Sequence, residues 1–249
     1  MKIFALMDLN VSQRQQRTFN QKKIEELLYS INQTCSGQFY MVDFLSKKVI
    51  VGSPYASILC GYPKELLEQE GFGFYLRLFK EDEWKRVDQM KEAAYKVLTR
   101  YPLSCRKKFV LSLDLRLITN KNEEIVLHHK STPYKLCKNG HLWLSLCYVT
   151  EASSEKMRGC ASFANMETGE RYRCSLVDGE PVLIKTESTN QEELQILKLL
   201  VKGFSDKQMC GLMGMSISTF KQRKRQLYKK LEANTSAEAI HRAHLLGII

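Results

Sequence analysis

The sequence predicts an α+β domain with a five-stranded antiparallel sheet and helices on one face, followed by an all-α domain of four helices. Three observations lead to this prediction. Between about residues 38 and 150, two strand-like runs come first, then several helical segments, then three more strand-like runs. The last sixty or so residues hold four amphipathic segments. One of these four segments is strongly basic.

The N-terminal part divides into an arm and a helix. Residues 1–19 include the polar run Ser12–Arg17 and are expected to form a loosely held arm. Ile24, Leu27, Leu28 and Ile31 follow with the spacing of one helix face. That helix either covers a sheet or pairs with its copy in a partner chain.

The next elements are short. Gln38–Phe44 and Lys48–Val51 read as the strands of a hairpin. Pro54 and the Gly61-Tyr-Pro63 break separate two helical pieces, Tyr55–Cys60 and Lys64–Gln69. A loop is expected through Phe72–Phe79, and then a longer helix from about Glu81 to Arg100 that ends before Pro102.

Three further strands complete the predicted sheet: Arg106–Ile118, Glu124–Tyr134 and His141–Thr150. Asn139-Gly140 is a strong hairpin signal before the last of them, because both residue types tolerate positive φ. Residues 153–187 are expected to form a small β extension and a linker, with short strands at Cys160–Phe163, Arg171–Leu176 and Val182–Lys185.

Residues 188–249 carry the four helices. The first runs from about Glu192 to Lys202, and the second begins after Ser205, where Gln208 completes a capping box. Gly214-Met215 forms a short turn, and Ser216 caps the third helix. The fourth starts at a second capping box, Thr235 with Glu238.

The third helix is built like a reader of the DNA major groove. Between Thr219 and Leu231 it holds six cations and no acidic residue. At ~100° per residue, Phe220, Leu227 and Leu231 form one apolar stripe. The opposite side carries Ser218, Lys221, Gln222, Arg225 and Lys229. On this stretch alone, a solvated surface helix remains an alternative.

The composition indicates a protein with packed cores, a polyanionic partner and reduced cysteines. The chain has 249 residues, 44% of them hydrophobic, and a formal net charge of +11, which favours a polyanionic partner. Ten Lys or Arg and five Asp or Glu fall in residues 188–249, so charge alone does not single out this domain. The eight scattered cysteines and the absence of an export signal or an apolar span predict reduced thiols, a cytoplasmic location and no membrane contact.

Residues 20–152 resemble a PAS domain. The resemblance rests on four segments: Phe39-Tyr-Met-Val-Asp43, Cys60-Gly-Tyr-Pro-Lys-Glu-Leu66, Phe79-Lys-Glu-Asp82 and Tyr148-Val-Thr150. It implies an input domain that senses a signal or docks a partner. The input itself, a small molecule or a protein, is left open.

Residues 188–249 resemble the LuxR family of bacterial transcription regulators. The matching residues are Glu193, Ile196-Leu197, Leu199-Leu200, Gly203-Phe-Ser205, Lys207-Gln-Met209, Leu212, Ser216, Thr219-Phe-Lys221, Lys230-Leu231, Glu238-Ala239, Ala243 and Gly247. Members usually have His where Arg223 stands, Asn at Gln226 and Arg at Ser236. These departures concern the DNA sequence that is read and the phosphate contacts, not the fold.

This second resemblance implies a DNA site. Lys221, Gln222 and Arg225 would approach base edges, and Lys207, Ser218, Thr219 and Lys224 would contact phosphates. Arg223 would pack its stem inward or present its charge to phosphate. Phe220, Leu212, Leu227 and Leu231 would be core.

Other chemistry finds little support in the sequence. His128 and His129 point to opposite faces of a strand, so they do not make a metal site, and a structural role is expected for them. Asp43 is either a cavity-lining residue or a turn residue. The sequence contains no phosphate-binding loop, dinucleotide fingerprint or nucleophile elbow. The cysteine motif that attaches a flavin in light-sensing PAS domains is also absent: Cys105-Arg106 is similar to it, but the other residues of the motif are missing. No metal, cofactor or enzymatic activity is therefore predicted.

The prediction is a bacterial regulator that binds double-stranded DNA as a homodimer, under control of the PAS-like domain. The fourth helix, alone or with the N-terminal helix, is the expected dimer surface, and RNA polymerase is a candidate partner. The alternative is an adaptor protein whose basic helix docks on an acidic partner.

Overall fold

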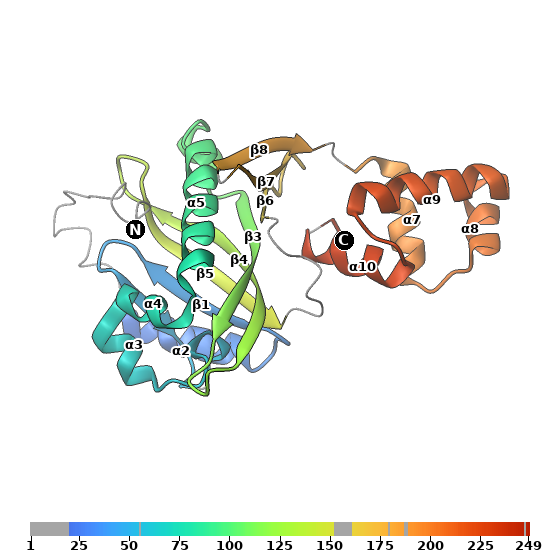
Figure 1. Ribbon diagram of the computed structural model, residues 1–249. Coiled ribbons are helices and arrows are strands. Elements are labelled where there is room, and N and C mark those ends of the chain that lie inside the picture. The colour runs from blue at the N-terminus through green and yellow to red at the C-terminus, as the bar shows by residue number, and fades with distance from the viewer. Residues whose placement is uncertain (1–19, 55, 152–160, 179, 187–188, 247) are drawn as a thin grey trace. The chain divides into compact units, whose positions relative to one another are not determined.

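The computed structural model describes residues 20–249 except 55, 152–160, 179, 187–188 and 247 (Figure 1). The chain divides into two compact units, Met1–Thr186 and Glu187–Ile249. The predicted arm at residues 1–19 lies outside the described residues, as does the polar run Ser153–Arg158. Among the described helices, none is both long and apolar enough to cross a membrane.

The first unit is built on one antiparallel sheet of eight strands in the order β2-β1-β5-β4-β3-β6-β7-β8. Its strands are β1 (Gln38–Asp43), β2 (Lys48–Val51), β3 (Phe109–Ile118), β4 (Glu124–Leu136), β5 (Leu142–Glu151), β6 (Ala161–Asn165), β7 (Arg171–Val177) and β8 (Glu180–Thr186). The α+β class is confirmed, but the expected sheet of five strands is wrong.

The three additional strands join the sheet because β6 pairs with the edge of β3. Phe109 lies opposite Asn165, and Leu113 lies opposite Ala161. Without β6, the outer edge of β3 would present unpaired backbone groups. The three short strands expected in the small β extension at residues 153–187 are present as β6, β7 and β8, and they continue the main sheet.

Side-chain alternation along β1 explains why both faces of the sheet are covered. Tyr40 and Val42 point into the main core, under the helices that connect β2 and β3. Met41, between them, points the other way and packs with Ile50 against Leu28 of α2 (Gln21–Asn32). Leu27, which its spacing places on the same apolar face of α2, is 54% exposed.

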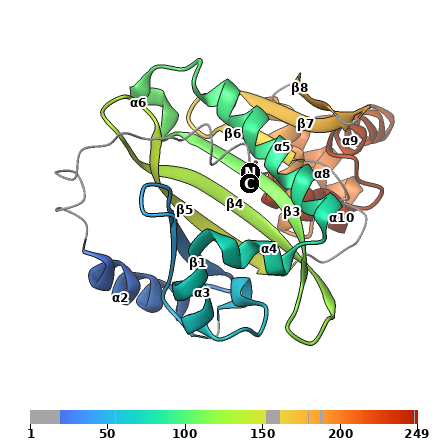
Figure 2. The same ribbon diagram turned by 60° about the vertical axis from the view of Figure 1, so that its left-hand side comes forward.

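The connecting helices lie on one face of the sheet, where α5 crosses the strands (Figure 2). They are η2 (Ser57–Leu59), α3 (Lys64–Glu70), η3 (Gly71–Phe74), α4 (Tyr75–Leu78), α5 (Glu81–Leu98) and α6 (Leu103–Arg106). The loop expected at Phe72–Phe79 is wrong. Phe72, Phe74 and Leu78 are buried, and the short helices η3 and α4 place them in the core.

The first turns of α5 cover the part of β3 that β6 does not reach. The guanidinium of Arg86 donates to the carbonyl of Asp114 at 2.9 Å. The backbone N–H of Arg116 donates to the Glu83 carboxylate at 3.2 Å. These contacts satisfy strand-edge groups and hold α5 against the sheet.

The second unit consists of α7 (Gln191–Val201), α8 (Asp206–Met213), α9 (Ile217–Leu231) and α10 (Ser236–Leu245). Asn190 caps α7 in a capping box with Glu193, and Ser205 caps α8 in another with Gln208. The core is Ile196, Leu197, Leu200, Met209, Cys210, Phe220, Leu227, Leu231, Ala233, Ala239 and Ala243. Leu212 was predicted to belong to it and does not, because its position on α8 leaves it 58% exposed.

Candidate DNA-binding surface and ligand cavity

Helices α8 and α9 form a helix-turn-helix. Helix α8 ends at Gly214, whose φ of 63° lies in the left-handed region that favours glycine. The N–H of Met215 then donates to the carbonyl of Cys210 at 3.0 Å, which closes the end of the helix. Ser216 accepts from the N–H of Thr219 at 3.2 Å and begins α9 at once. The turn is therefore short and fixed at both ends.

The two sides of α9 differ as its pattern predicts. Phe220, Leu227 and Leu231 are buried in the core of the unit. Gln222 and Arg225, which would have to be exposed to reach DNA bases, are exposed. Seven of the eight residues predicted for the site are exposed: Lys207, Ser218, Thr219, Lys221, Gln222, Arg223 and Arg225.

Four basic side chains gather on one surface of the unit. Lys221, Lys224, Arg225 and Lys229 line the same open hollow, together with Tyr228 and two acidic residues, Asp206 and Glu232. The hydroxyls of Ser218 and Thr219 instead lie 2.9 Å from the Ser216 hydroxyl at the start of the helix. A cationic surface with bidentate donors is the chemistry that meets guanine edges and phosphates.

Lys224 is the eighth predicted residue, and it is half-buried in an ion pair. Its ammonium lies 2.6 Å from the Asp206 carboxylate of α8 and 5.5 Å from the centre of the Tyr228 ring. Burial lowers the pKa of Lys224, but its hydrogen bond to Asp206 and its electrostatic interaction with Tyr228 raise it, and the net shift is upward. The pair joins the two helices of the helix-turn-helix.

Arg223 and Lys230 are also paired inside the unit. The Arg223 guanidinium lies 3.3 Å from the Glu192 carboxylate of α7, with the Arg223 side chain 48% exposed. Lys230 lies 2.9 Å from Glu193, which also caps α7. Sequence reasoning missed these acidic partners because they come from other helices. Lys221 and Arg225 are thus exposed and form no ion pair with a described residue, whereas Arg223, Lys224 and Lys230 pair with acids of other helices in the bundle.

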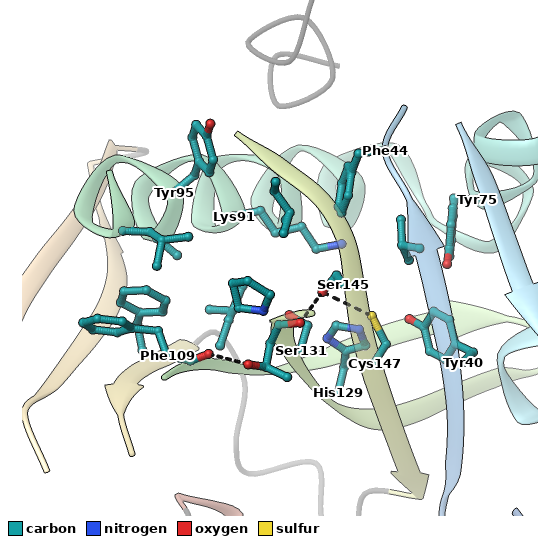
Figure 3. Close-up of a pocket in the computed structure, with 18 of the residues that line it drawn as sticks. Tyr40, Phe44, Tyr75, Lys91, Tyr95, Phe109, His129, Ser131, Ser145 and Cys147 are labelled. Carbon is teal, nitrogen blue, oxygen red and sulfur yellow. Dashed lines mark hydrogen bonds between the residues drawn. The ribbon is translucent and has the colours of Figure 1, made fainter. Parts of the chain in front are cut away.

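The first unit contains a cavity of about 100 Å³ between α5 and the sheet (Figure 3). Its walls are mostly apolar and aromatic, from Val42, Phe44, Phe72, Leu98, Phe109, Leu111 and Phe163. Lys91 of α5 points into this space, above His129 and Ser145 (Figure 3). Sequence reasoning named only Asp43 as a candidate lining residue of a cavity and did not identify Lys91, although a signal existed. Lys91 comes four residues after the buried Val87 and three before Ala94, on the apolar side of α5.

The polar groups of the cavity are desolvated. Burial lowers the pKa of Lys91, although nearby Cys147 and Asp88 oppose this shift. Burial, the charge of Lys91 and His128 hold the pKa of His129 well below its ordinary value. The His129 ring is therefore neutral at pH 7, and its Nδ1 has no hydrogen-bond partner among the described residues.

The remaining candidates have structural roles. His128 is buried on the other face of β4 and lies 2.8 Å from Asp114 through its Nδ1, so the two histidines do point apart. Asp43 accepts from the N–H groups of Leu45 and Ser46, at 3.0 and 3.3 Å. It is therefore a turn residue, the second of its two predicted roles.

Comparison with known proteins gives a family for part of the chain. Residues 189–243 match the family "Bacterial regulatory proteins, luxR family". The HTH-type transcriptional regulator MalT of Vibrio cholerae is 30% identical over 121 residues, which is 44% of this chain and 13% of MalT. The chain thus matches only a small part of this relative.

Solved structures of VqmA from Vibrio cholerae are also similar. The VqmA dimer without target DNA is 13% identical, with 91% of this chain and 87% of that chain covered and a TM-score of 0.28. The VqmA–ligand–DNA complex is 15% identical, with 90% and 86% covered and a TM-score of 0.27. Such TM-scores do not establish a shared arrangement. The family match and the four-helix bundle together identify residues 189–243 as a LuxR-type helix-turn-helix domain of the bacterial regulatory proteins.

Proposed function

We propose that this protein is a cytoplasmic transcription regulator that binds specific double-stranded DNA through α9. The observation that carries the proposal is the division of α9 into two sides. Phe220, Leu227 and Leu231 anchor the helix. Lys221, Gln222 and Arg225 face solvent. Lys and Arg donate to guanine, and Gln pairs with adenine in a bidentate manner.

The phosphate contacts surround this reading face. Lys207 on α8 and Ser218 and Thr219 at the start of α9 are exposed, as phosphate contacts must be. Arg223 and Lys224 can contribute only as they exchange their intramolecular partners, Glu192 and Asp206, for phosphate. One such domain covers one half-site, so the regulator binds a two-fold related site as a dimer.

The first unit is the input domain of the proposed regulator. Its first five strands and the helices between β2 and β3 have the order expected of the PAS-like domain, which supports that assignment. The cavity beneath α5 offers a place for a signal molecule. Helix α5 also packs against β7 and β8, and β8 ends at Thr186, next to the DNA-binding unit in the chain. A signal that shifts α5 would thus act on the strand leading to that unit.

Selection of duplexes from a random-sequence pool tests the proposal. Full-length protein should enrich one motif with two related half-sites, and raising salt should weaken binding steeply as counterions are released. An adaptor protein that uses the basic helix to dock on an acidic partner would retain duplexes without enriching any motif. That result would overturn the proposed function.

A further inference from the structure

The cavity of the first unit holds an ammonium group that makes no ion pair with a described residue, although the charge of Asp88, three residues earlier on the same helix, acts on it. Helix α5 carries three lysines, and two of them are exposed and paired one turn away: Lys85 with Glu81 at 2.7 Å, and Lys96 with Glu92 at 2.7 Å. Lys91 instead enters the cavity (Figure 3) and has no ion-pair partner among the described residues. An unpaired charge in a poorly solvated space is costly, and a bound anion would offset that cost.

A second polar group of the cavity also lacks a partner. His129 is 2% exposed, and its Nδ1 makes no hydrogen bond to any described residue. Buried polar atoms of native proteins nearly always have partners, so an exception requires an explanation. A bound molecule that supplies a polar group beside Lys91 would explain both orphan groups together.

The rest of the cavity restricts the body of such a molecule. Aromatic and aliphatic side chains form most of its wall. Six lining residues carry a hydroxyl, and among these Ser145 donates to the Thr132 carbonyl at 3.0 Å, Thr132 donates to the Phe109 carbonyl at 2.9 Å, and the Tyr95 hydroxyl lies 2.6 Å from Nδ1 of His141. The volume of about 100 Å³ is below the roughly 150 Å³ of an apolar cavity that takes up benzene. The body is therefore no larger than a single small ring, and a short branched chain fits this volume most easily. A nucleotide or another large polyanion does not fit.

We propose that this cavity binds a small organic anion, an apolar body with one carboxylate or ionised hydroxyl, whose oxygen contacts the Lys91 ammonium while His129 contacts the same polar end. The proposal rests on the proposed function, because it names the class of signal that the input domain receives. Cationic ligands are disfavoured by the charge of Lys91. Fully apolar ligands are disfavoured because they would leave both polar groups unpaired.

Two matched pairs of probes test the charge requirement: benzoate against benzamide, and isobutyrate against isobutyramide. Each pair has nearly the same shape and differs in charge. Titration of the full-length protein at pH 7, followed by calorimetry and by the fluorescence of Trp84, which lines the cavity, should show binding of at least one acid. That acid should bind at least tenfold more tightly than its amide. Equal affinity within both pairs, or no binding of either acid, would overturn the proposal.

Three variants locate the binding group. Lys91→Met should weaken binding of the acid at least tenfold and leave the amide unchanged, whereas Lys91→Arg should retain most of the affinity. Lys96→Met removes a charge from the exposed side of the same helix and should behave like the unaltered protein. An acid affinity that is unchanged in Lys91→Met would contradict the assignment. Circular dichroism of each variant confirms that it folds.

Duplex binding without any acid separates the two proposals. If the protein binds its selected duplex but neither acid, the ligand class is wrong and the proposed function stands. If it binds acids as expected but enriches no duplex motif, the proposed function is wrong and the cavity assignment survives as a binding site.

Discussion

Lys91 of α5 and His129 of β4 line the same cavity (Figure 3). Burial, and after it the positive charge of Lys91, hold the pKa of His129 well below its ordinary value, so the imidazole is neutral. The first unit thus holds a desolvated ammonium and an unpartnered imidazole nitrogen within an apolar wall. Such an arrangement costs stability, as sites made for ligands often do.

Replacing Lys91 by Met should stabilise the unliganded protein by roughly 1 kcal/mol at pH 7. The pKa of Lys91 is lowered in the folded protein, so the unfolded chain binds the proton more readily. Stability should therefore rise with pH from the lowered folded pKa up to the ordinary lysine value, and Lys91→Met should remove this rise. Urea unfolding at several pH values measures both effects. A clear destabilisation by Lys91→Met would contradict them.

Glu170 should make the first unit sensitive to acid. Hydrogen bonds from Lys185, at 2.6 Å, and from Tyr101, at 2.6 Å, lower its pKa from 4.5 to about 2, with a further contribution from Tyr172. A lowered carboxyl pKa gives stability that is present above about pH 4.5 and lost as the pH falls toward 2.

Glu170→Gln should therefore lower the free energy of unfolding by about 1–2 kcal/mol at pH 7, and flatten its dependence on pH below 4.5. The control is Glu167→Gln, three residues earlier, where the side chain is 60% exposed and paired with Lys108. Acid unfolding curves compare the two variants. If the two substitutions lowered the free energy of unfolding equally, the hydrogen bonds of Glu170 with Tyr101, Tyr172 and Lys185 would not hold β7 and β8 in the sheet.

Gly214 should be the backbone position on which the helix-turn-helix depends most. Its φ is 63°, and a Cβ placed there would meet no atom within 4 Å. The added Cβ would not clash, so only the backbone strain of a positive φ would destabilise the variant. Gly214→Ala should therefore lower the free energy of unfolding of the second unit by about 1 kcal/mol. Gly214→Asn should cost less, since Asn tolerates this conformation. Thermal unfolding of both variants provides the comparison, and equal melting temperatures for Ala and Gly would contradict the strain argument.

Lys224 and Asp206 should be coupled in stability. A double-mutant cycle with Lys224→Met and Asp206→Asn should give a coupling energy of about 0.5–1 kcal/mol. This value is kept low because the Asp206 side chain is 35% exposed and solvent screens the pair. The more open pair of Arg223 with Glu192, at 3.3 Å, serves as the control and should give less. The same Lys224→Met protein tests the phosphate role, because loss of a phosphate contact weakens all duplex sequences alike.

The hairpins and helix caps could be predicted because their signals are local. Asn139-Gly140 marks the turn before β5, and Ser205 and Ser216 cap the helices they were expected to cap. Pairing of β3 with β6 was missed because about fifty residues separate the two strands, and no turn signal encodes such a contact. The prediction of a loop at Phe72–Phe79 was wrong for a related reason, since burial of the aromatic residues outweighed the turn signal of Gly71 and Gly73.

The periodicity of α9 predicted which of its residues face solvent, but not which cations are already paired. Lys221 and Arg225 are exposed, while Lys224 and Arg223 lie against acids from α8 and α7. Only the assembled bundle brings these acids close. The same holds for Lys91, whose position on α5 was visible in the sequence but whose cavity is formed by distant strands.

The most direct measurement is the sequence preference of Arg225→Ala on the duplex motif selected by the unaltered protein. Each base pair of the motif is varied in turn, and Lys198→Ala, on the exposed side of α7, provides a control for simple loss of charge. Arg225→Ala should lose about 1–3 kcal/mol of discrimination at one position of each half-site and keep it elsewhere. Lys198→Ala should keep discrimination at every position. A preference that Arg225→Ala leaves unaltered at all positions would contradict the reading of DNA by the exposed side of α9.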